Sequence, residues 1–379
     1  MNIIIAGDVC PRYRVGDYIE REEYDYLLVE VQSLIKSADY SIVNFESPVV
    51  NGNASPIEKQ GPNLKCTPNT VKALQWAGFN CMTLANNHFL DYGPNGVQDT
   101  LNAIDSLGLD RVGGGMTLAE AEKILYKEIK GQTLAIINCC EHEFSIATKD
   151  SAGSNPLNPV RQYNAIKEAR KKADIVIIIV HGGHEMFQLP SQRMVETYRF
   201  FIDAGADAVV NHHQHCYSGY ETYKGCPIVY GLGNFLFDIS PVRKNDIWNY
   251  GMVVELNLSS TERSFILYPY CQCAEEPKIS MLPMDSFDEK LSEINGLIAN
   301  PELLEQTIND YYAKSSTNYE STLEPIQNKY YFKLKHRGLL PSFIKRRTLI
   351  SIANYVMCES HRDRFIWWLN HAANTTRNK

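Results

Sequence analysis

A series of apolar, β-branched segments in this chain each end at polar residues of the kinds that bind metals. The residues at these endings are Asp8, Glu46, Asn87 with His88, His181 with Glu185, His213 with His215, and Asn234. Buried strands often have continuous apolar sequences, and open α/β sheets bind ligands just beyond the carboxyl ends of their strands. A single polar residue after a strand usually does no more than end it. The repetition, with His-x-His included, predicts that the strands deliver ligands to one common edge.

Helical patterns separate these predicted strands and carry ordinary start and stop signals. The patterns cover residues 68–78, 96–108 and 191–205, and each closes on a glycine. Hairpins are predicted to turn at Lys130–Gly131 and at Lys224–Gly225, and the alternation over residues 252–270 predicts a third. Strand and helix in alternation indicate a layered α/β fold. The hairpins make the sheets mixed, which suits two sheets packed face to face with helices outside.

The pattern changes after about Tyr270, where helical spacing continues and no further strand is predicted. We therefore expect a main domain over residues 1–276 and a helical C-terminal region over residues 277–379. Residues 329–347 are rich in basic and aromatic side chains and contain no acidic residue. Such a segment can lie on an anionic membrane surface. A solvated helical face that packs its aromatic residues on the main domain gives the same pattern, so both interpretations stay open.

Composition narrows the class of protein and its expected location. The chain has 379 residues, a formal net charge of -7 and a hydrophobic content of 44%, which is ordinary for a globular protein and gives no overall attraction to nucleic acid. No apolar stretch approaches the roughly 18 residues that a spanning helix needs. A core strand follows the first residue at once, and ten cysteines occur without a Cys-x-x-Cys pair. We therefore expect reduced thiols and a cytoplasmic location, with peripheral membrane contact through residues 329–347 as the alternative.

The motifs GDVC, NFESP, ANNHFLDYG, HGGHE, HHQH and YGLGNF, in this order, closely resemble the bacterial CapA family, which is associated with capsule and poly-γ-glutamate synthesis. That family is similar to a branch of the calcineurin-like metallophosphatases. The resemblance covers Met1 to Tyr270. It implies a metallophosphatase-like four-layer α-β-β-α sandwich with mixed sheets, to which the C-terminal helices are an appendage.

The resemblance also implies a site with one or two divalent metal ions, for which manganese, iron and zinc are candidates. The implied ligands are Asp8, Glu46, Asn87, His181, His213 and His215. Two ions about 3.5–4 Å apart need a shared anionic oxygen, and Glu46 is the best-placed carboxylate for that role. His88 would act as a general acid or as a donor to developing negative charge, with its ring held by Asp91. A helix-start capping pair is the alternative for these two residues.

The sequence departs from the family patterns at three positions. Cys10 stands where the superfamily usually has a second ligand, so it is either a thiolate ligand or a buried apolar thiol, and one metal position is expected to be weak or empty. Gly182 replaces a tryptophan and is expected to open space beside His181. Gln214 replaces a proline between the two histidines, which is expected to make that loop less rigid. Glu185 is either a further ligand or a residue that fixes one, and Asn234 either orients the pocket or forms a turn.

We therefore expect a metal-dependent hydrolase that acts on a phosphoester or an amide-like bond during the synthesis of a capsule or a poly-γ-glutamate-type polymer. Its partners would be an anionic polymer, a phosphoester or a γ-glutamyl substrate. A non-catalytic, polymer-binding accessory factor in capsule assembly and a metal-dependent peptide epimerase are the alternatives. The sequence gives neither the substrate, nor the metal, nor the oligomeric state.

Overall fold

The computed structural model describes residues 1–243, 246–259, 261–323, 326, 328–357 and 369. The chain divides into two compact units, Met1–Glu305 and Gln306–Lys379. This division groups helix α8 (Asp288–Ile298) with the strands of the first unit. The expected domain boundary at residues 276–277 stays a prediction.

The first unit is built around two mixed sheets. The larger sheet has the order β16 (Ile279–Met281), β15 (Arg263–Gln272), β14 (Tyr250–Leu258), β1 (Asn2–Cys10), β2 (Tyr40–Phe45), β3 (Cys81–Thr83), β4 (Asp110–Val112), with β13 (Asn234–Phe237) also paired to β1. The second sheet has the order β11 (Tyr220–Tyr223), β12 (Cys226–Val229), β10 (Ala208–His212), β9 (Ile175–His181), β7 (Gln132–Cys140), β6 (Leu125–Ile129). A short pair joins β5 (Gly114–Gly115) to β8 (Gly153–Ser154).

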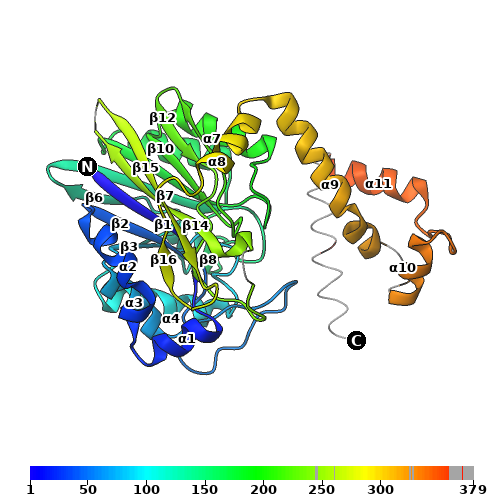
Figure 1. Cartoon of the computed structure of the whole chain (residues 1–379), viewed down its shortest axis with the longest axis horizontal. Helices are drawn as coiled ribbons and strands as arrows, with labels where there is room; N and C mark the ends of the chain where they lie inside the picture. Colours follow the sequence, from blue (N-terminus) through cyan, green and yellow to red (C-terminus); the bar gives the residue numbers. More distant parts are fainter. Residues whose placement is uncertain (244–245, 260, 324–325, 327, 358–368, 370–379) are drawn as a thin grey trace. The chain divides into compact units, whose positions relative to one another are not determined.

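Helices cover the outer faces of both sheets. Helices α1 (Tyr13–Glu20), α2 (Tyr24–Ser37), α3 (Pro68–Ala77) and α4 (Gly93–Ser106) form a shared core with the first sheet, and α6 (Pro159–Ala169) and α7 (Gln192–Ala204) pack on the second. Figure 1 shows α2, α3 and α4 on one side of the strands and α7 on the other. The short elements α5 (Leu118–Ala121) and η1 (Ile247–Asn249) lie in connections. The predicted α/β sandwich with mixed sheets is confirmed.

The sequence signals for individual elements act as expected. Gly78 ends α3 in the left-handed conformation, with φ of 108°, and the Ser191 side chain caps the start of α7. The three predicted hairpins form as antiparallel pairs, namely β6 with β7, β11 with β12, and β14 with β15. The central strands are buried throughout, which explains their continuous apolar sequence.

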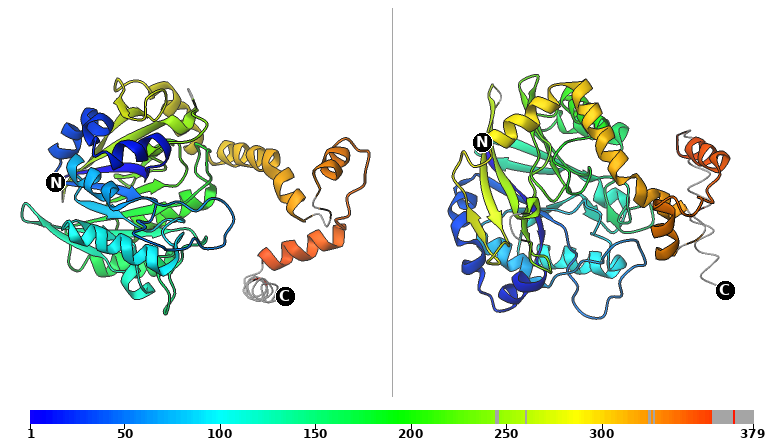
Figure 2. Two further views of the ribbon diagram at one scale, coloured as in Figure 1. Left: turned by 90° about the horizontal axis from the view of Figure 1, so that it is seen from below. Right: turned by 45° about the vertical axis from the view of Figure 1, so that its right-hand side comes forward.

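Strands β1, β2 and β3 run parallel in the first sheet, and β7, β9, β10 and β12 run parallel in the second. Their carboxyl ends therefore share an edge within each sheet. Close polar contacts, such as that of His212 Nδ1 with Asp8 Oδ1 at 3.2 Å, join the two edges. The long loop from β2 to α3 begins at the same edge and is drawn in blue in Figures 1 and 2.

The described part of the second unit is helical and contains no strand. It contains most of α9 (Pro301–Leu323), then α10 (Lys329–His336) and α11 (Arg346–Met357). The left panel of Figure 2 shows, in orange, the loop that joins α10 to α11. Among the described residues, no helix has both the length and the apolar character needed to cross a membrane.

Candidate metal centre

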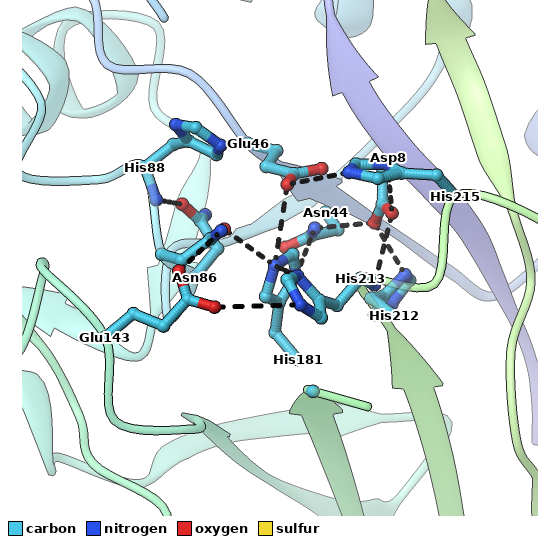
Figure 3. A network of polar contacts seen from close by, with 12 residues as sticks. Asp8, Asn44, Glu46, Asn86, His88, Glu143, His181, His212, His213 and His215 are labelled. Atoms are coloured by element: carbon cyan, nitrogen blue, oxygen red, sulfur yellow. Dashed lines mark hydrogen bonds and ion pairs between the residues drawn. The ribbon is translucent and has the colours of Figure 1, made fainter. Parts of the chain in front are cut away.

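Five strands deliver the predicted ligands to one buried cluster (Figure 3). Asp8 lies near the end of β1, Glu46 directly follows β2, and Asn87 follows β3 by a short turn. In the second sheet, His181 is the last residue of β9, and His213 and His215 follow β10. All six side chains are buried. The structure therefore brings together the whole predicted ligand set, although their role as ligands stays a prediction.

A first group of ligand atoms surrounds Nε2 of His181. Asn87 Oδ1 lies 3.0 Å from this nitrogen, His213 Nδ1 lies 3.0 Å from it, and Glu46 Oε1 lies 3.5 Å from it. Glu46, His181 and His213 each offer a ligand atom within 4.8 Å of the others. Burial lowers the pKa of His181 well below its usual value, and the neighbouring imidazoles lower it further. His181 is therefore held neutral, which is the form that binds metals.

A second group consists of Asp8, Glu46 and His215, again with ligand atoms within 4.8 Å of one another. His215 Nδ1 lies 3.7 Å from Asp8 Oδ2, and His215 Nε2 lies 3.8 Å from Glu46 Oε1. Glu46 belongs to both groups. This is the geometry that a carboxylate shared between two cations requires.

Glu46 is the residue that tests whether the cluster fits metal ions. Its side chain is 0% exposed, and neither carboxylate oxygen has a hydrogen-bond partner among the described residues. Burial raises the pKa of Glu46 well above its ordinary value, and the negative charge of Asp8 raises it further. A buried carboxylate without partners is costly, and native proteins keep such a group mainly where a cation compensates it. The donor set therefore fits one or two divalent ions.

Asn234 fixes the orientation of His215. The Asn234 amide nitrogen donates to the carbonyl oxygens of His215 and Trp248, at 3.1 and 3.2 Å. Its oxygen therefore faces His215 Nδ1, at 2.9 Å, and accepts a hydrogen bond from that nitrogen. This leaves Nε2 unprotonated and able to bind an ion. Asn234 also begins β13, so its role is not that of a turn former.

Cys10 lies in an apolar surrounding made by Leu64, Phe237 and Trp248. Burial raises the pKa of its thiol well above the usual value, and the charge of Glu46 adds to this rise. Both effects favour a neutral packing thiol over a thiolate ligand. Glu185 is exposed, and its negative charge acts on Glu46 and His215. That placement suits an electrostatic influence on the cluster.

The backbone of the His-x-His segment is held in a strained conformation. His213 has φ of 90° and His215 has φ of 55°, in the left-handed region that residues other than glycine rarely adopt. Gln214 fastens the loop, because its amide nitrogen donates to the carbonyl oxygens of Phe187 and Leu189, at 2.8 and 3.2 Å. The lower rigidity expected from the absence of proline stays a prediction.

The space beside Gly182 is also not open. A Cβ atom at this position would lie 2.6 Å from Cγ of Glu141, whose carboxylate pairs with Arg193 at 2.6 Å. The Glu141 side chain therefore fills the space that a tryptophan at position 182 would take. The expectation of a vacant space next to His181 is wrong for this reason.

His88 and Asp91 form a buried pair with a partner that the sequence did not indicate. His88 Nδ1 lies 2.7 Å from one oxygen of Asp91, and Nζ of Lys59 lies 2.5 Å from the other. The Lys59 side chain is only 2% exposed, although it comes from the loop between β2 and α3. Burial lowers the pKa of His88, the Asp91 carboxylate opposes this, and the Lys59 charge adds to the lowering. Nε2 is then the ring nitrogen available for a substrate.

The alternative of a helix-capping role for Asp91 is not supported. The residue before α4 is Tyr92, and its side chain makes no capping bond. The Asp91 carboxylate instead contacts His88, Lys59 and the backbone amide of Leu64, which donates to it at 2.6 Å. Asp91 thus ties the loop between β2 and α3 to His88.

Sequence reasoning missed three further polar residues at the cluster. The Asn44 amide nitrogen donates to Asp8 Oδ1 at 2.7 Å, and His212 Nδ1 lies 3.2 Å from the same oxygen. Glu143 Oε2 accepts a hydrogen bond from the Asn87 amide at 3.1 Å. The sequence signal for Asn44 and His212 is a polar residue inside an otherwise apolar strand. Glu143 and Lys59 come from polar loops and carry no such signal.

The protein is a two-sheet α/β sandwich that gathers carboxylates and imidazoles at shared strand ends. The chain belongs to the family described as bacterial capsule synthesis protein PGA_cap, whose family model matches residues 2–239. It is 34% identical over 254 residues to the capsule biosynthesis protein CapA of Bacillus anthracis, covering 65% of this chain and 62% of that protein. It is 35% identical over 245 residues to the PGA biosynthesis protein CapA of Bacillus subtilis, covering 64% of each chain.

The matches thus span less than two thirds of the length of these two relatives. Among solved structures, the chain is similar to a 5′-nucleotidase precursor from Thermus thermophilus, with 13% identity and a TM-score of 0.42. That likeness covers 79% of this chain and 59% of the nucleotidase.

Proposed function

We propose that the protein is a metal-dependent hydrolase that acts on a phosphoester or amide-like bond in the synthesis of a capsule or a poly-γ-glutamate-type polymer. The observation that carries this proposal is Glu46, a buried carboxylate without hydrogen-bond partners among the described residues that stands between two groups of ligand atoms. A buried carboxylate without partners is costly, so its presence favours a metal centre, and with it chemistry over polymer binding alone. Membership in the capsule synthesis family supports the polymer as the setting.

Each residue of the cluster has a role in this proposal. Asp8, Glu46, Asn87, His181, His213 and His215 would hold one or two divalent ions, for which manganese, iron and zinc all suit the donors. Such ions, when bound, polarise the electrophile and lower the pKa of water to about 7. Asn234 keeps His215 in the tautomer that binds through Nε2.

His88 is the residue that we propose to carry a proton during the reaction. Asp91 accepts the hydrogen bond from His88 Nδ1 and so turns Nε2 toward incoming groups. Lys59 balances the charge of Asp91, and burial, with the Lys59 charge added, lowers the pKa of His88, so that its ring is neutral before the reaction. A leaving group would then receive its proton from Nε2 after that nitrogen has taken one from the attacking water.

The substrate that we propose is anionic, either a phosphoester or a γ-glutamyl compound, and the polymer itself would be a partner. The cytoplasmic location expected from the sequence stays a prediction. It is tested separately from the reaction, by fractionation of cells that express the full chain.

The test is a measurement of metal content followed by a substrate screen on the full chain. Purified protein would be stripped with a chelator, reloaded with manganese, zinc or iron, and assayed on phosphoesters and γ-glutamyl peptides. We expect metal to bind and at least one substrate class to be cleaved. The matched control is Glu255→Gln, which alters a carboxylate that is 9% exposed and that Asn2 and Tyr268 already satisfy.

The outcomes separate the competing functions. Metal binding with no cleavage of either class, together with retention of poly-γ-glutamate, would favour a non-catalytic accessory factor. Inversion at an α-carbon without bond cleavage would favour an epimerase. Failure to bind any of the ions would contradict the metal centre itself.

A further inference from the structure

The segment from Asn328 to Met357, here called the basic apolar segment, combines positive charge with exposed apolar side chains. Every charged residue in it is basic. These residues are Lys329, Lys333, Lys335, Arg337, Lys345, Arg346 and Arg347. The whole chain has a formal net charge of -7, so the positive charge is concentrated here against the overall balance. The segment lies outside the part matched by the family model, which ends at residue 239.

The structure shows that the segment is folded around one aromatic residue. Tyr331 of α10 is buried, stacks on Phe343 with 5.8 Å between ring centroids, and donates a hydrogen bond from its hydroxyl to the carbonyl oxygen of Pro341 at 2.9 Å. Asn328 caps α10 by accepting from the amide of Tyr330 at 2.8 Å. The loop between α10 and α11 is thus fastened back onto α10.

This local fold leaves the other apolar side chains exposed. Leu339 is 66% exposed, Ile350 is 58% exposed and Phe343 is 51% exposed, and the exposed set also includes Tyr330, Leu334, Leu340, Leu349 and Val356. Single exposed apolar residues are normal on a protein surface, but a run of them within one short segment marks a binding surface. Basic residues occur between them throughout.

The charges at the start of α11 point to an anionic partner. Lys345, Arg346 and Arg347 stand at its amino end, and no acidic residue occupies its first turn. The helix dipole places partial positive charge at that end, so basic residues there are unfavourable unless an anion lies close by. Anionic groups outside the chain would relieve this repulsion.

We propose that the basic apolar segment binds the surface of a membrane that contains anionic lipid. Lipid headgroups supply the negative charge, and the acyl boundary takes up the leucine, isoleucine and phenylalanine side chains. A soluble anionic polymer satisfies only the first of these needs, because it offers no apolar layer for the exposed side chains. Both needs are met together at the lipid surface. This proposal is independent of the metal centre and of the reaction proposed for it.

The experiment is co-sedimentation of the full chain with vesicles. One set of vesicles contains phosphatidylcholine with phosphatidylglycerol, and the other contains phosphatidylcholine alone. We expect the chain to sediment with the first set, to bind less as salt is raised, and to stay in solution with the second set. Soluble poly-γ-glutamate, added to the chain without vesicles, tests the polymer as the alternative partner.

Two variants separate charge from apolar insertion, and both change exposed side chains so that the fold is kept. The charge variant is Lys345→Gln with Arg346→Gln and Arg347→Gln, and the apolar variant is Leu339→Ser with Leu349→Ser and Ile350→Ser, which leaves the stack of Phe343 on Tyr331 in place. Matched controls are Lys123→Gln with Lys149→Gln and Lys171→Gln, and Val160→Ser at a site that is 70% exposed. We expect affinity to fall about fivefold for each basic residue removed. The apolar variant should lose binding to a similar degree, and the controls should match the unchanged chain.

Equal binding to both vesicle sets, or none to either, would overturn the proposal. So would an apolar variant that binds anionic vesicles as well as the unchanged chain does. If poly-γ-glutamate binds the chain tightly, the charge variant abolishes that binding and the apolar variant does not, the segment is a polymer-binding site instead.

Discussion

Replacing Glu46 with glutamine should change stability in opposite directions with and without metal. The substitution keeps the size of the side chain and removes its charge. The Glu46 carboxylate is 0% exposed and has no hydrogen-bond partner among the described residues. An unsatisfied buried polar group costs on the order of 1–3 kcal/mol, and more when it is charged. Glu46→Gln should therefore raise the melting temperature in the presence of a chelator by a few degrees.

With metal present, the order of stability should reverse. An ion at about 100 times its dissociation constant stabilises the folded protein by about 2.7 kcal/mol. Glu46 contributes to both ligand groups, so its loss weakens both positions. Loss of a residue that merely supports a ligand costs about 10- to 100-fold in metal affinity, and loss of a direct, shared ligand should cost at least that much. The unchanged protein should then gain stability from metal while Glu46→Gln gains little.

The assay is thermal melting of both proteins with chelator and with excess manganese, alongside measurement of bound metal. Glu255→Gln serves as the control, because Glu255 accepts hydrogen bonds from Asn2 at 2.9 Å and Tyr268 at 2.8 Å. It should lower the melting temperature in both conditions and leave the gain from metal intact. If Glu46→Gln melts below the unchanged protein in chelator, or binds metal as tightly, the interpretation of Glu46 as a shared ligand is wrong.

His181→Ala and His213→Ala should each lower the metal content of the purified protein, and full occupancy with unaltered affinity in both would show that the site is assigned wrongly. Cys10→Ser should change metal content little, because the thiol packs among apolar side chains; a large loss would identify a thiolate ligand. His88→Ala should keep metal and fold while kcat on any substrate found falls by about 10² to 10⁴, and loss of metal would make His88 a ligand. Lys59→Met should lower the free energy of unfolding in urea by about 3 kcal/mol, because it breaks a buried ion pair; an unchanged value would mean that the pair contributes nothing.

The strand ends could be predicted because their signals are local. Continuous apolar runs mark strands that are buried on both faces, and a glycine such as Gly78 or Gly205 marks the end of a helix. Parallel strands then bring their carboxyl ends together, so the ligand cluster follows from the alternation of strand and helix. The order of the strands in the two sheets has no comparable local signal.

The residues that sequence reasoning missed depend on tertiary contacts. Lys59 comes from a polar loop, and only the folded chain brings its side chain to Asp91, 2.5 Å away. Successive residues of a strand point to opposite faces, so a sequence pattern that directs His213 toward the site directs His212 away from it, into packing or to the surface. The two sheets meet at that end, however, so His212 contacts Asp8 from the second sheet. Alternation assigns a side chain to a face of its own sheet, and a site between two sheets draws ligands and their neighbours from both.

The two ligand groups are unequal, and Cys10 is the reason. The first group combines the Glu46 carboxylate with the Asn87 amide and the imidazoles of His181 and His213. The second has Asp8, Glu46 and His215, while the Cys10 thiol, which stands where the family resemblance implies a further ligand, has its pKa raised by burial among apolar side chains. Imidazole nitrogen favours zinc and iron, whereas a group dominated by carboxylates favours manganese or magnesium. We therefore expect the position beside His181 to bind more tightly and to prefer zinc or iron. The position beside Asp8 should bind more weakly and accept harder ions.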